Sequence, residues 1–167
     1  MHSEISIDID ARPELVFALA HDVERWADLL PHYVRSRARD RDAWGRPLVD
    51  FIARRPLVPA IGIGIPVAWR SRTWNEPETL RLRFEHVAGA TRGMSVTWHI
   101  DTRGREGACR VTIGHEFSPR VPGFARFVDR FFTRPIAGRT LATFKALAEA
   151  VGPVDGSDPT SPTHQTA

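Results

Sequence analysis

Several side chains able to carry protons or hydrogen bonds occur at alternate positions among apolar residues. His86 follows Leu80, Leu82 and Phe84, and His115 follows Cys109, Val111 and Ile113. Because alternate residues of a strand point to the same face, each histidine is predicted to share the face of its apolar neighbours. A neutral imidazole in such surroundings can give or accept a proton, so general acid–base chemistry is one role that this pattern predicts.

Other polar groups follow the same rule. Ser71 and Thr73 share a face with Trp69, while Met94, Val96 and Trp98 form a further apolar set on one strand. The apolar sets have to face the interior, so these hydroxyls and both histidines should lie inside the domain or at its mouth. An apolar cavity with a few convergent polar groups is the usual form of a small-molecule site.

Each of these side chains also has a purely structural interpretation. Trp26, Trp69, Trp98 and Met94 are residue types that commonly fill a core. The histidines could be core residues with satisfied hydrogen bonds, and Tyr33 could anchor its hydroxyl to the backbone. Cys109 is interpreted as a small buried hydrophobe rather than a nucleophile.

Several classes of protein are excluded or disfavoured. The chain has no H-E-x-x-H, G-x-S-x-G or phosphate-loop motif, and its one cysteine excludes an internal disulfide. No carboxylate is clearly placed with His86 and His115 on their strand face, so no metal site is expected there. No cofactor is expected either. The 23 basic residues balance 20 acids at a net charge of +3, which gives no indication of nucleic-acid binding. Acids in the first ten residues argue against a signal peptide, so a cytoplasmic location is expected.

The elements that position these residues follow from hydrophobic periodicity. Ile5, Ile7 and Ile9 predict a strand, Pro13 begins a short helix, and a second short helix is expected from Asp22 to Leu30. Six further strands, joined by short turns, favour an antiparallel meander. They are predicted over 33–41, 48–54, 68–75, 79–87, 94–102 and 108–117.

The end of the chain returns to helical spacing. Aromatic residues three and four apart after Pro122 predict a long helix to Val151 that Pro135 interrupts or kinks. Such a helix is the one element able to cover the concave face of a curved sheet, so the fold class is α+β. Residues 1–151 are predicted to form one domain, and residues 152–167, rich in proline and small polar residues, a disordered tail.

This order resembles the helix-grip fold of the START-like superfamily, in particular its polyketide cyclase/dehydrase group. The similar motifs, in chain order, are the opening strand with Ala11-Arg12-Pro13, the segment Asp22 to Trp26 followed by Tyr33, the pair Met94 and Trp98, and the closing helix with Lys145 and Glu149. The resemblance implies a curved sheet of about seven strands wrapped on the C-terminal helix, with an interior cavity. It does not fix an activity, because this fold hosts carriers, receptors and cyclases.

The resemblance and the strand alternation together predict a set of ligand-binding residues. They are Trp26, Tyr33, Trp69, Ser71, Thr73, Phe84, His86, Met94, Trp98, His115 and Phe144. Tyr33, His86 and His115 are the candidates for catalysis. Cyclases of this group carry inward arginines that polarise the substrate oxygens, and those positions fall on Thr73 and near Phe84 here. Arg55 or Arg72 could take their place if the strand register were shifted by one residue.

The segment 56–67 has a composition of its own. It is apolar but rich in proline and glycine, so it cannot be a regular strand throughout. It is interpreted as a buried crossover, as a lid over the cavity, or as a patch that makes transient membrane contact.

Three functions remain open from the sequence. The first is binding of a hydrophobic small molecule such as a lipid, an isoprenoid quinone or a polyketide. The second is a polyketide cyclase or dehydratase, and the third an interaction module whose interior is filled by its own side chains. A cavity of a few hundred cubic ångströms would favour the first two. The sequence does not indicate an oligomeric state.

Overall fold

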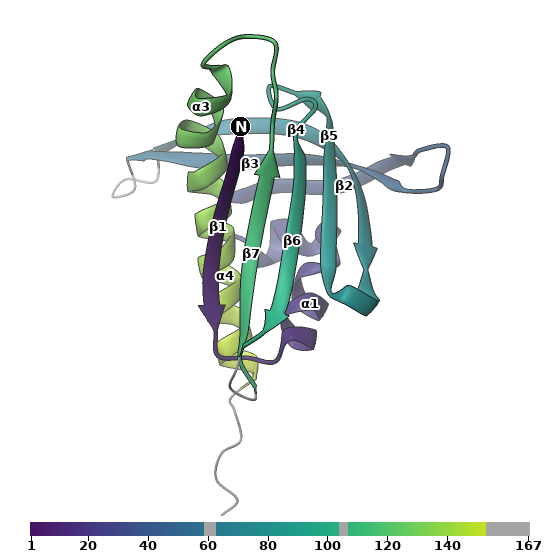
Figure 1. Cartoon of the computed structure of the whole chain (residues 1–167), viewed down its shortest axis with the longest axis vertical. Helices are drawn as coiled ribbons and strands as arrows, with labels where there is room; N and C mark the ends of the chain where they lie inside the picture. The colour runs from purple at the N-terminus through teal and green to yellow at the C-terminus, as the bar shows by residue number, and fades with distance from the viewer. Residues whose placement is uncertain (59–62, 104–106, 153–167) are drawn as a thin grey trace, which may run out of the picture.

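The computed structural model describes residues 1–58, 63–103 and 107–152, which form a curved antiparallel sheet around a long helix (Figure 1). Seven strands follow the order β1-β7-β6-β5-β4-β3-β2. Their bounds are β1 His2–Ile9, β2 Tyr33–Arg41, β3 Pro47–Val58, β4 Ile63–Glu76, β5 Arg81–Gly89, β6 Ser95–Thr102 and β7 Cys109–Glu116. The predicted α+β helix-grip architecture is therefore confirmed.

The helices lie where the sequence places them. After β1 come α1 Pro13–Ala20, the 3-10 turn η1 Val23–Arg25 and α2 Trp26–Leu29; a second 3-10 turn, η3 Pro77–Thr79, precedes β5. Pro13 opens α1, where its missing N–H costs no hydrogen bond, and α2 ends two residues before Pro31. These short helices close one end of the curved sheet.

The C-terminal helix consists of three consecutive segments. They are α3 Phe124–Val128, the π-helical turn η4 Asp129–Thr133 and α4 Arg134–Val151. Pro135 is the second residue of α4, where it lacks a backbone donor and its ring would clash with a preceding carbonyl in a continuous α-helix. The wider π turn directly before it accommodates that defect, which confirms the predicted interruption.

Strand pairing confirms the predicted alternation of side chains. Thr73 lies opposite Phe84, Phe84 opposite Val96, and Val96 opposite His115, so these side chains share the concave face across four strands. All four are at most 7% exposed. The register is therefore not shifted by one residue on β4 or β5.

The segment 56–67 belongs largely to a long β3–β4 hairpin. Arg55 pairs with Ile65 and Pro56 with Gly64, and a register shift follows at Val58, so the strand is not regular. Residues 59–62 lie outside the described part of the chain. Ile65 is 43% exposed and Pro66 is also exposed, so the interpretation as a buried crossover is wrong for this region.

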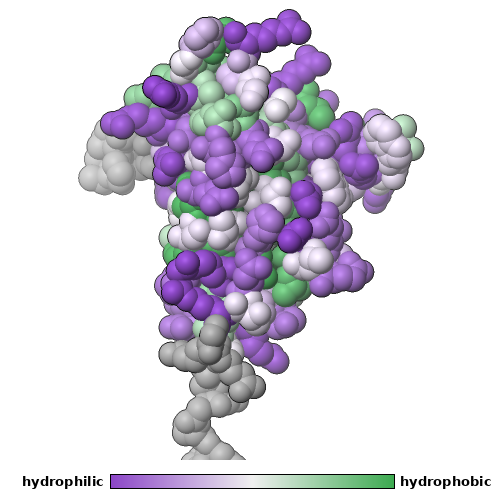
Figure 2. Space-filling view, viewed as in Figure 1, coloured by the Kyte–Doolittle hydropathy of each residue, from purple (hydrophilic) through white to green (hydrophobic). Residues whose placement is uncertain are grey.

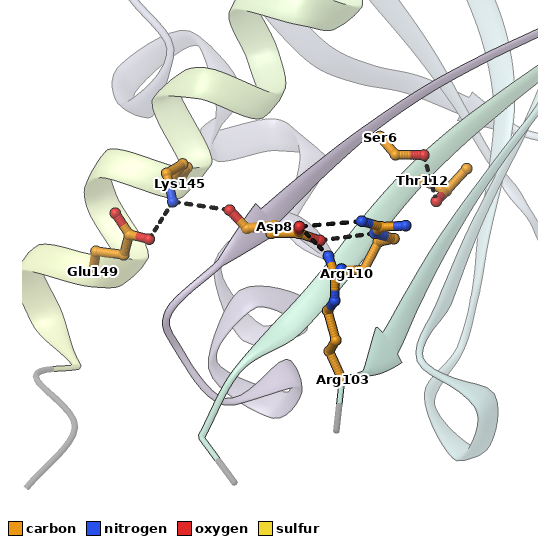
Figure 3. A network of polar contacts seen from close by, with 7 residues as sticks. All are labelled: Ser6, Asp8, Arg103, Arg110, Thr112, Lys145 and Glu149. Carbon is orange, nitrogen blue, oxygen red and sulfur yellow. Dashed lines mark hydrogen bonds and ion pairs between the residues drawn. The ribbon is translucent and has the colours of Figure 1, made fainter. Parts of the chain in front are cut away.

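The C-terminal half of α4 is fixed to β1 by polar contacts (Figure 3). Lys145 Nζ donates to the backbone oxygen of Asp8 at 2.8 Å and contacts Glu149, whose carboxylate accepts the backbone N–H of Asp10 at 2.8 Å. The Asp8 carboxylate in turn pairs with Arg110 on β7 and with Arg103. These contacts, here called the β1 clamp, give a structural role to the closing Lys–Glu motif.

Candidate functional site

A small cavity of about 80 Å³ lies between the concave face of the sheet and the N-terminal half of α4. Its wall is mainly aromatic and aliphatic, and its residues come from α2, six strands, the β5–β6 turn, η4 and α4. They are Trp26, Tyr33, Phe51, Val67, Trp69, Phe84, His86, Thr91, Met94, Val96, Trp98, Ile113, His115, Phe132, Thr133, Ile136, Ala137 and Thr140. Most of these are buried; Val67, Trp69, His86 and Phe132 are half-buried and mark the mouth.

Trp26 occupies the centre of the aromatic wall. Its ring centroid lies 5.4 Å from that of Tyr33, 5.6 Å from Phe84 and 5.4 Å from Trp98. Its indole N–H donates to the backbone oxygen of Ala20 at 2.9 Å, so its one polar group is satisfied away from the cavity. The short helix α2 thus presents the apolar face of the indole to the cavity.

A stack of three flat rings crosses β3, β4 and β5. Phe51 and Trp69 lie 5.3 Å apart at an interplanar angle of 15°, and Trp69 and His86 lie 5.9 Å apart at 25°. A register shift between Arg70 and Ser71 brings Trp69 opposite Gly89, where a Cβ would meet the Ala68 carbonyl oxygen at 2.6 Å. Only glycine allows this close approach of the two backbones, and its φ of +95° also favours glycine.

His86 lies at the mouth with a defined partner. Its Nδ1 is 2.6 Å from the hydroxyl oxygen of Thr91, in a turn closed by the bond from Gly93 N–H to the His86 carbonyl. Burial, with a smaller effect from His115, lowers the pKa of His86 to about 3. The ring is therefore neutral at physiological pH.

His115 is more deeply placed and less well satisfied. It is 5% exposed, and its Nδ1 makes no hydrogen bond of normal geometry, although the Ser3 backbone opposite it on β1 favours the protonated ring. Burial outweighs this effect and lowers the pKa of His115 to about 4. His115 is thus one of the few polar side chains that line the cavity.

The third polar group of the wall is the hydroxyl of Thr140. It donates to the Ile136 carbonyl at 2.9 Å and so accepts from His32 Nε2, which lies 2.9 Å away. This fixes the tautomer of His32, whose pKa burial lowers to about 4. Tyr33 lies beside the same hydroxyl, and burial raises its pKa well above the usual range, so its phenol stays protonated.

The structure brings most of the predicted site residues together. Eight of the eleven line the cavity, as the residue set above shows. Ser71 is fully buried beside the wall. Thr73 is buried on the concave face but borders a separate hollow and not this cavity. Phe144 packs against the rings of Trp26 and Trp98. Whether any of the eleven binds a ligand stays a prediction.

Sequence reasoning did not single out several wall residues. Thr133, Ile136, Ala137 and Thr140 recur at spacings of three and four along the C-terminal helix, and that spacing could have identified the face that covers the cavity. Phe51 shares its strand parity with buried Val49 and Ala53 and could have been found by the same rule. The contact of His32 with Thr140 joins residues 108 positions apart and carries no local signal.

No arginine lies in the described wall of the cavity. Thr73 and Phe84 occupy the positions at which the resemblance places inward arginines. Arg72 points outward to Asp42 and Glu85, and the Arg55 guanidinium covers the ring of Phe131 at 5.2 Å. Neither of these arginines therefore replaces the missing inward charges. Within the described ranges no three His, Cys, Asp or Glu side chains gather to hold a metal ion.

Comparisons with known proteins give a consistent result. Residues 1–151 match the family model described as polyketide cyclase/dehydrase and lipid transport. The fold is similar to that of the Zhui aromatase/cyclase from Streptomyces sp. R1128, with a TM-score of 0.72 and 17% identity over 94% of this chain and 99% of that one. No curated protein matches the sequence.

Two other solved structures share the fold at lower identity. A START superfamily protein from Mycobacterium smegmatis gives a TM-score of 0.66 and 13% identity, covering 90% of this chain and 98% of that one. Norcoclaurine synthase from Thalictrum flavum gives a TM-score of 0.67 and 13% identity, covering 88% of this chain and 85% of that one. At these identities the likeness extends to the fold alone.

Proposed function

The chain belongs to the polyketide cyclase/dehydrase and lipid transport family, and from this premise we propose that it binds an uncharged hydrophobic small molecule in the cavity under α4. The observation that carries the proposal is the chemistry of the wall. Among the described wall residues none is Asp, Glu, Lys or Arg, and the two histidines that line it are held neutral by burial.

An uncharged wall selects against an ionised ligand. A carboxylate or phosphate placed there would lose its hydration without gaining a counter-ion, which is strongly unfavourable. An apolar body gains about 0.8 kcal/mol for each buried methylene group, and one neutral oxygen could bond the imidazoles of His86 or His115. A lipid, a quinone or a polyketide with a neutral reacting part fits this description.

The size of the cavity adds a requirement. The cavity volume of about 80 Å³ is well below the roughly 300–1,000 Å³ of ordinary ligand pockets. A lipid, quinone or polyketide therefore has to enlarge the cavity in order to bind. The half-buried rings of Trp69, His86 and Phe132 form the wall at the mouth, so these residues can move with a smaller loss of burial than the rest of the wall. An interior that never opens would instead support the interaction module.

Membrane contact through 56–67 remains part of the proposal. The described ends of this segment carry exposed Ile65 and Pro66, and its tip lies outside the described residues. No helix of the described ranges is both long and apolar enough to cross a bilayer. Nucleic acid is not among the proposed partners.

A cyclase or dehydratase is the alternative function. It is supported by the family and by His86 and His115, neutral groups able to transfer protons beside a substrate, with Tyr33 as a donor of a hydrogen bond. The uncharged residues at Thr73 and Phe84 count against it, because they cannot stabilise a developing enolate as an arginine does.

The sharpest test fills the cavity. Ala137 lines it and is 7% exposed, so Ala137→Phe should occupy the space at a cost of about 1–3 kcal/mol in stability and abolish quenching of tryptophan fluorescence by an apolar probe. Ala142→Phe, on the exposed side of the same helix, is the matched control and should bind the probe as the parent does. Equal binding by both variants would contradict the proposal.

A double variant separates binding from catalysis. His86→Ala combined with His115→Ala should keep most of the affinity for an apolar probe, because the aromatic wall supplies most of the contact area. The same proteins are assayed with a poly-β-ketone analogue. Turnover by the parent that falls about 100-fold or more in the variant, with binding retained, would establish the enzyme instead of the carrier.

A further inference from the structure

A row of phenylalanine rings leads from the core to the surface around α3. Phe117, which is 3% exposed, contacts Phe124 with ring centroids 6.3 Å apart, and Phe124 contacts Phe127 at 6.4 Å. Phe127 then meets Phe131 at 4.9 Å and Phe132 at 5.7 Å. The outer rings are not covered, since Phe127 is 48% and Phe131 36% exposed. Adjoining exposed aromatic rings mark a contact surface on a folded protein.

This surface adjoins the mouth of the cavity. Phe132 lines the cavity while its neighbour Phe131 faces out, and the Arg55 guanidinium lies 5.2 Å over the Phe131 ring. Arg55 pairs in register with Ile65, which is 43% exposed and shares its strand face with the mouth residue Val67. The exposed residues Ile65, Phe127 and Phe131 are here called the α3 face.

The two chain segments that carry the α3 face are strongly positive. Residues 51–67 and 118–139 contain seven arginines and one acid, Asp129, which gives +6 in a chain whose total is +3. The rest of the chain is therefore net negative. Asp129 is itself paired with Arg134 at 2.8 Å, whereas Arg126 and Arg130 are exposed beside the rings. Figure 2 shows hydrophobic residues reaching the surface among hydrophilic ones at the end of the molecule that carries α3.

We propose that the α3 face docks on the surface of an anionic lipid bilayer, with Phe127 and Phe131 among the headgroups and Arg126 and Arg130 on their phosphates. Exposed aromatic rings flanked by arginines match the apolar and anionic layers of such a surface. A second copy is a poor occupant, because the exposed Arg126 and Arg130 of the two copies would repel each other. Docking would set the cavity mouth against the bilayer, a consequence that rests on the proposed function.

The test is sedimentation of the full chain with phosphatidylcholine vesicles, with and without phosphatidylglycerol. The parent should sediment only with the anionic vesicles and less at high salt. Phe127→Asp with Phe131→Asp should weaken binding about tenfold or more, and so should Arg126→Gln with Arg130→Gln, which leaves every ring in place. Trp44→Asp is the matched control, since Trp44 is a 71% exposed ring under Arg46 on a different surface, and it should sediment as the parent does.

The outcomes separate this proposal from the preceding one. A parent that ignores anionic vesicles but binds an apolar probe in solution overturns α3-face docking and the membrane contact through 56–67, and leaves the cavity proposal standing. The reverse result overturns only the cavity. If the arginine variant loses vesicle binding and the phenylalanine variant does not, the surface is a site for acidic macromolecules, and membrane docking is overturned. If the Trp44 variant loses vesicle binding equally, the binding is not confined to the α3 face, and this result also overturns the docking proposal.

Discussion

The two ends of the C-terminal helix are held in different ways. The C-terminal half of α4 is fixed by the β1 clamp and by Phe144, which is fully buried against Trp26 and Trp98. The other end begins with five-residue α3 and a π turn, and its Phe127 and Phe131 are exposed. The cavity lies between these regions and opens toward the second. A helix fixed at one end and loosely held at the other allows a cavity to enlarge without unfolding of the sheet, because local opening occurs where buried contacts are few.

The largest expected difference between the ends is in stability. Phe144→Ala should lower the free energy of unfolding by about 3–5 kcal/mol, since it removes a fully buried ring. Phe131→Ala should cost about 1 kcal/mol or less, because that ring is 36% exposed. Urea unfolding with unchanged m-values measures both. Similar losses would show that the two ends are equally well packed.

The second prediction uses pH to distinguish the ends. His115 at the cavity has a pKa lowered from 6.5 to about 4, so the unfolded chain binds more protons between these values. The stability it contributes is complete above pH 6.5 and is lost as the pH falls to 4, by up to about 3 kcal/mol. Asp8 in the clamp has a pKa lowered to about 2 by Arg110 and Arg103, so its contribution is lost only below about pH 4.

In the variant His115→Phe, the free energy of unfolding should depend less steeply on pH between 6.5 and 4. A smaller slope remains between pH 6.5 and 4, because His32 and His86 are also held neutral by burial. Asp8→Asn should lower stability equally across that range, so the slope there is unchanged, and it should remove the further loss of stability below about pH 4. Urea unfolding across the pH range tests both, and a parent profile flat from pH 7 to 4 would contradict the assignment.

How far the sequence could predict these features depends on the range of the interaction. Strand alternation placed Phe84, Trp98 and His115 inward, because a two-residue period is a local property of the chain. It could not separate wall residues from their neighbours, since whether Ser71 or Phe144 borders empty space depends on packing between distant segments. The motif with Lys145 and Glu149 was visible, but its contact with Asp8 spans 137 residues.

Ligand binding should change the two ends unequally. An apolar probe at saturating concentration contacts the half of α4 near Thr133 and Ala137, so amide hydrogens from 133 to 140 should exchange about tenfold or more slowly. Amides from 144 to 150 are already protected by the clamp and should change less. Hydrogen exchange followed by mass spectrometry resolves the two peptides. A uniform slowing along α4 would mean that the helix opens as one unit.

The smallest effect concerns the clamp itself. Lys145→Met should cost about 1 kcal/mol, because it removes a hydrogen bond to the Asp8 backbone and an ion pair whose side chains are 36% and 30% exposed and therefore partly screened. Arg134→Met, at the loosely held end, removes a pair whose arginine is 55% exposed and should cost less than about 0.5 kcal/mol. The pKa of Glu149, which Lys145 lowers, should rise in the first variant and stay unchanged in the second, as NMR titration of its carboxyl carbon can measure. Equal stability losses with an unmoved Glu149 pKa would show that the clamp holds α4 no better than an ordinary surface ion pair, and the fixed end would then depend on Phe144 alone.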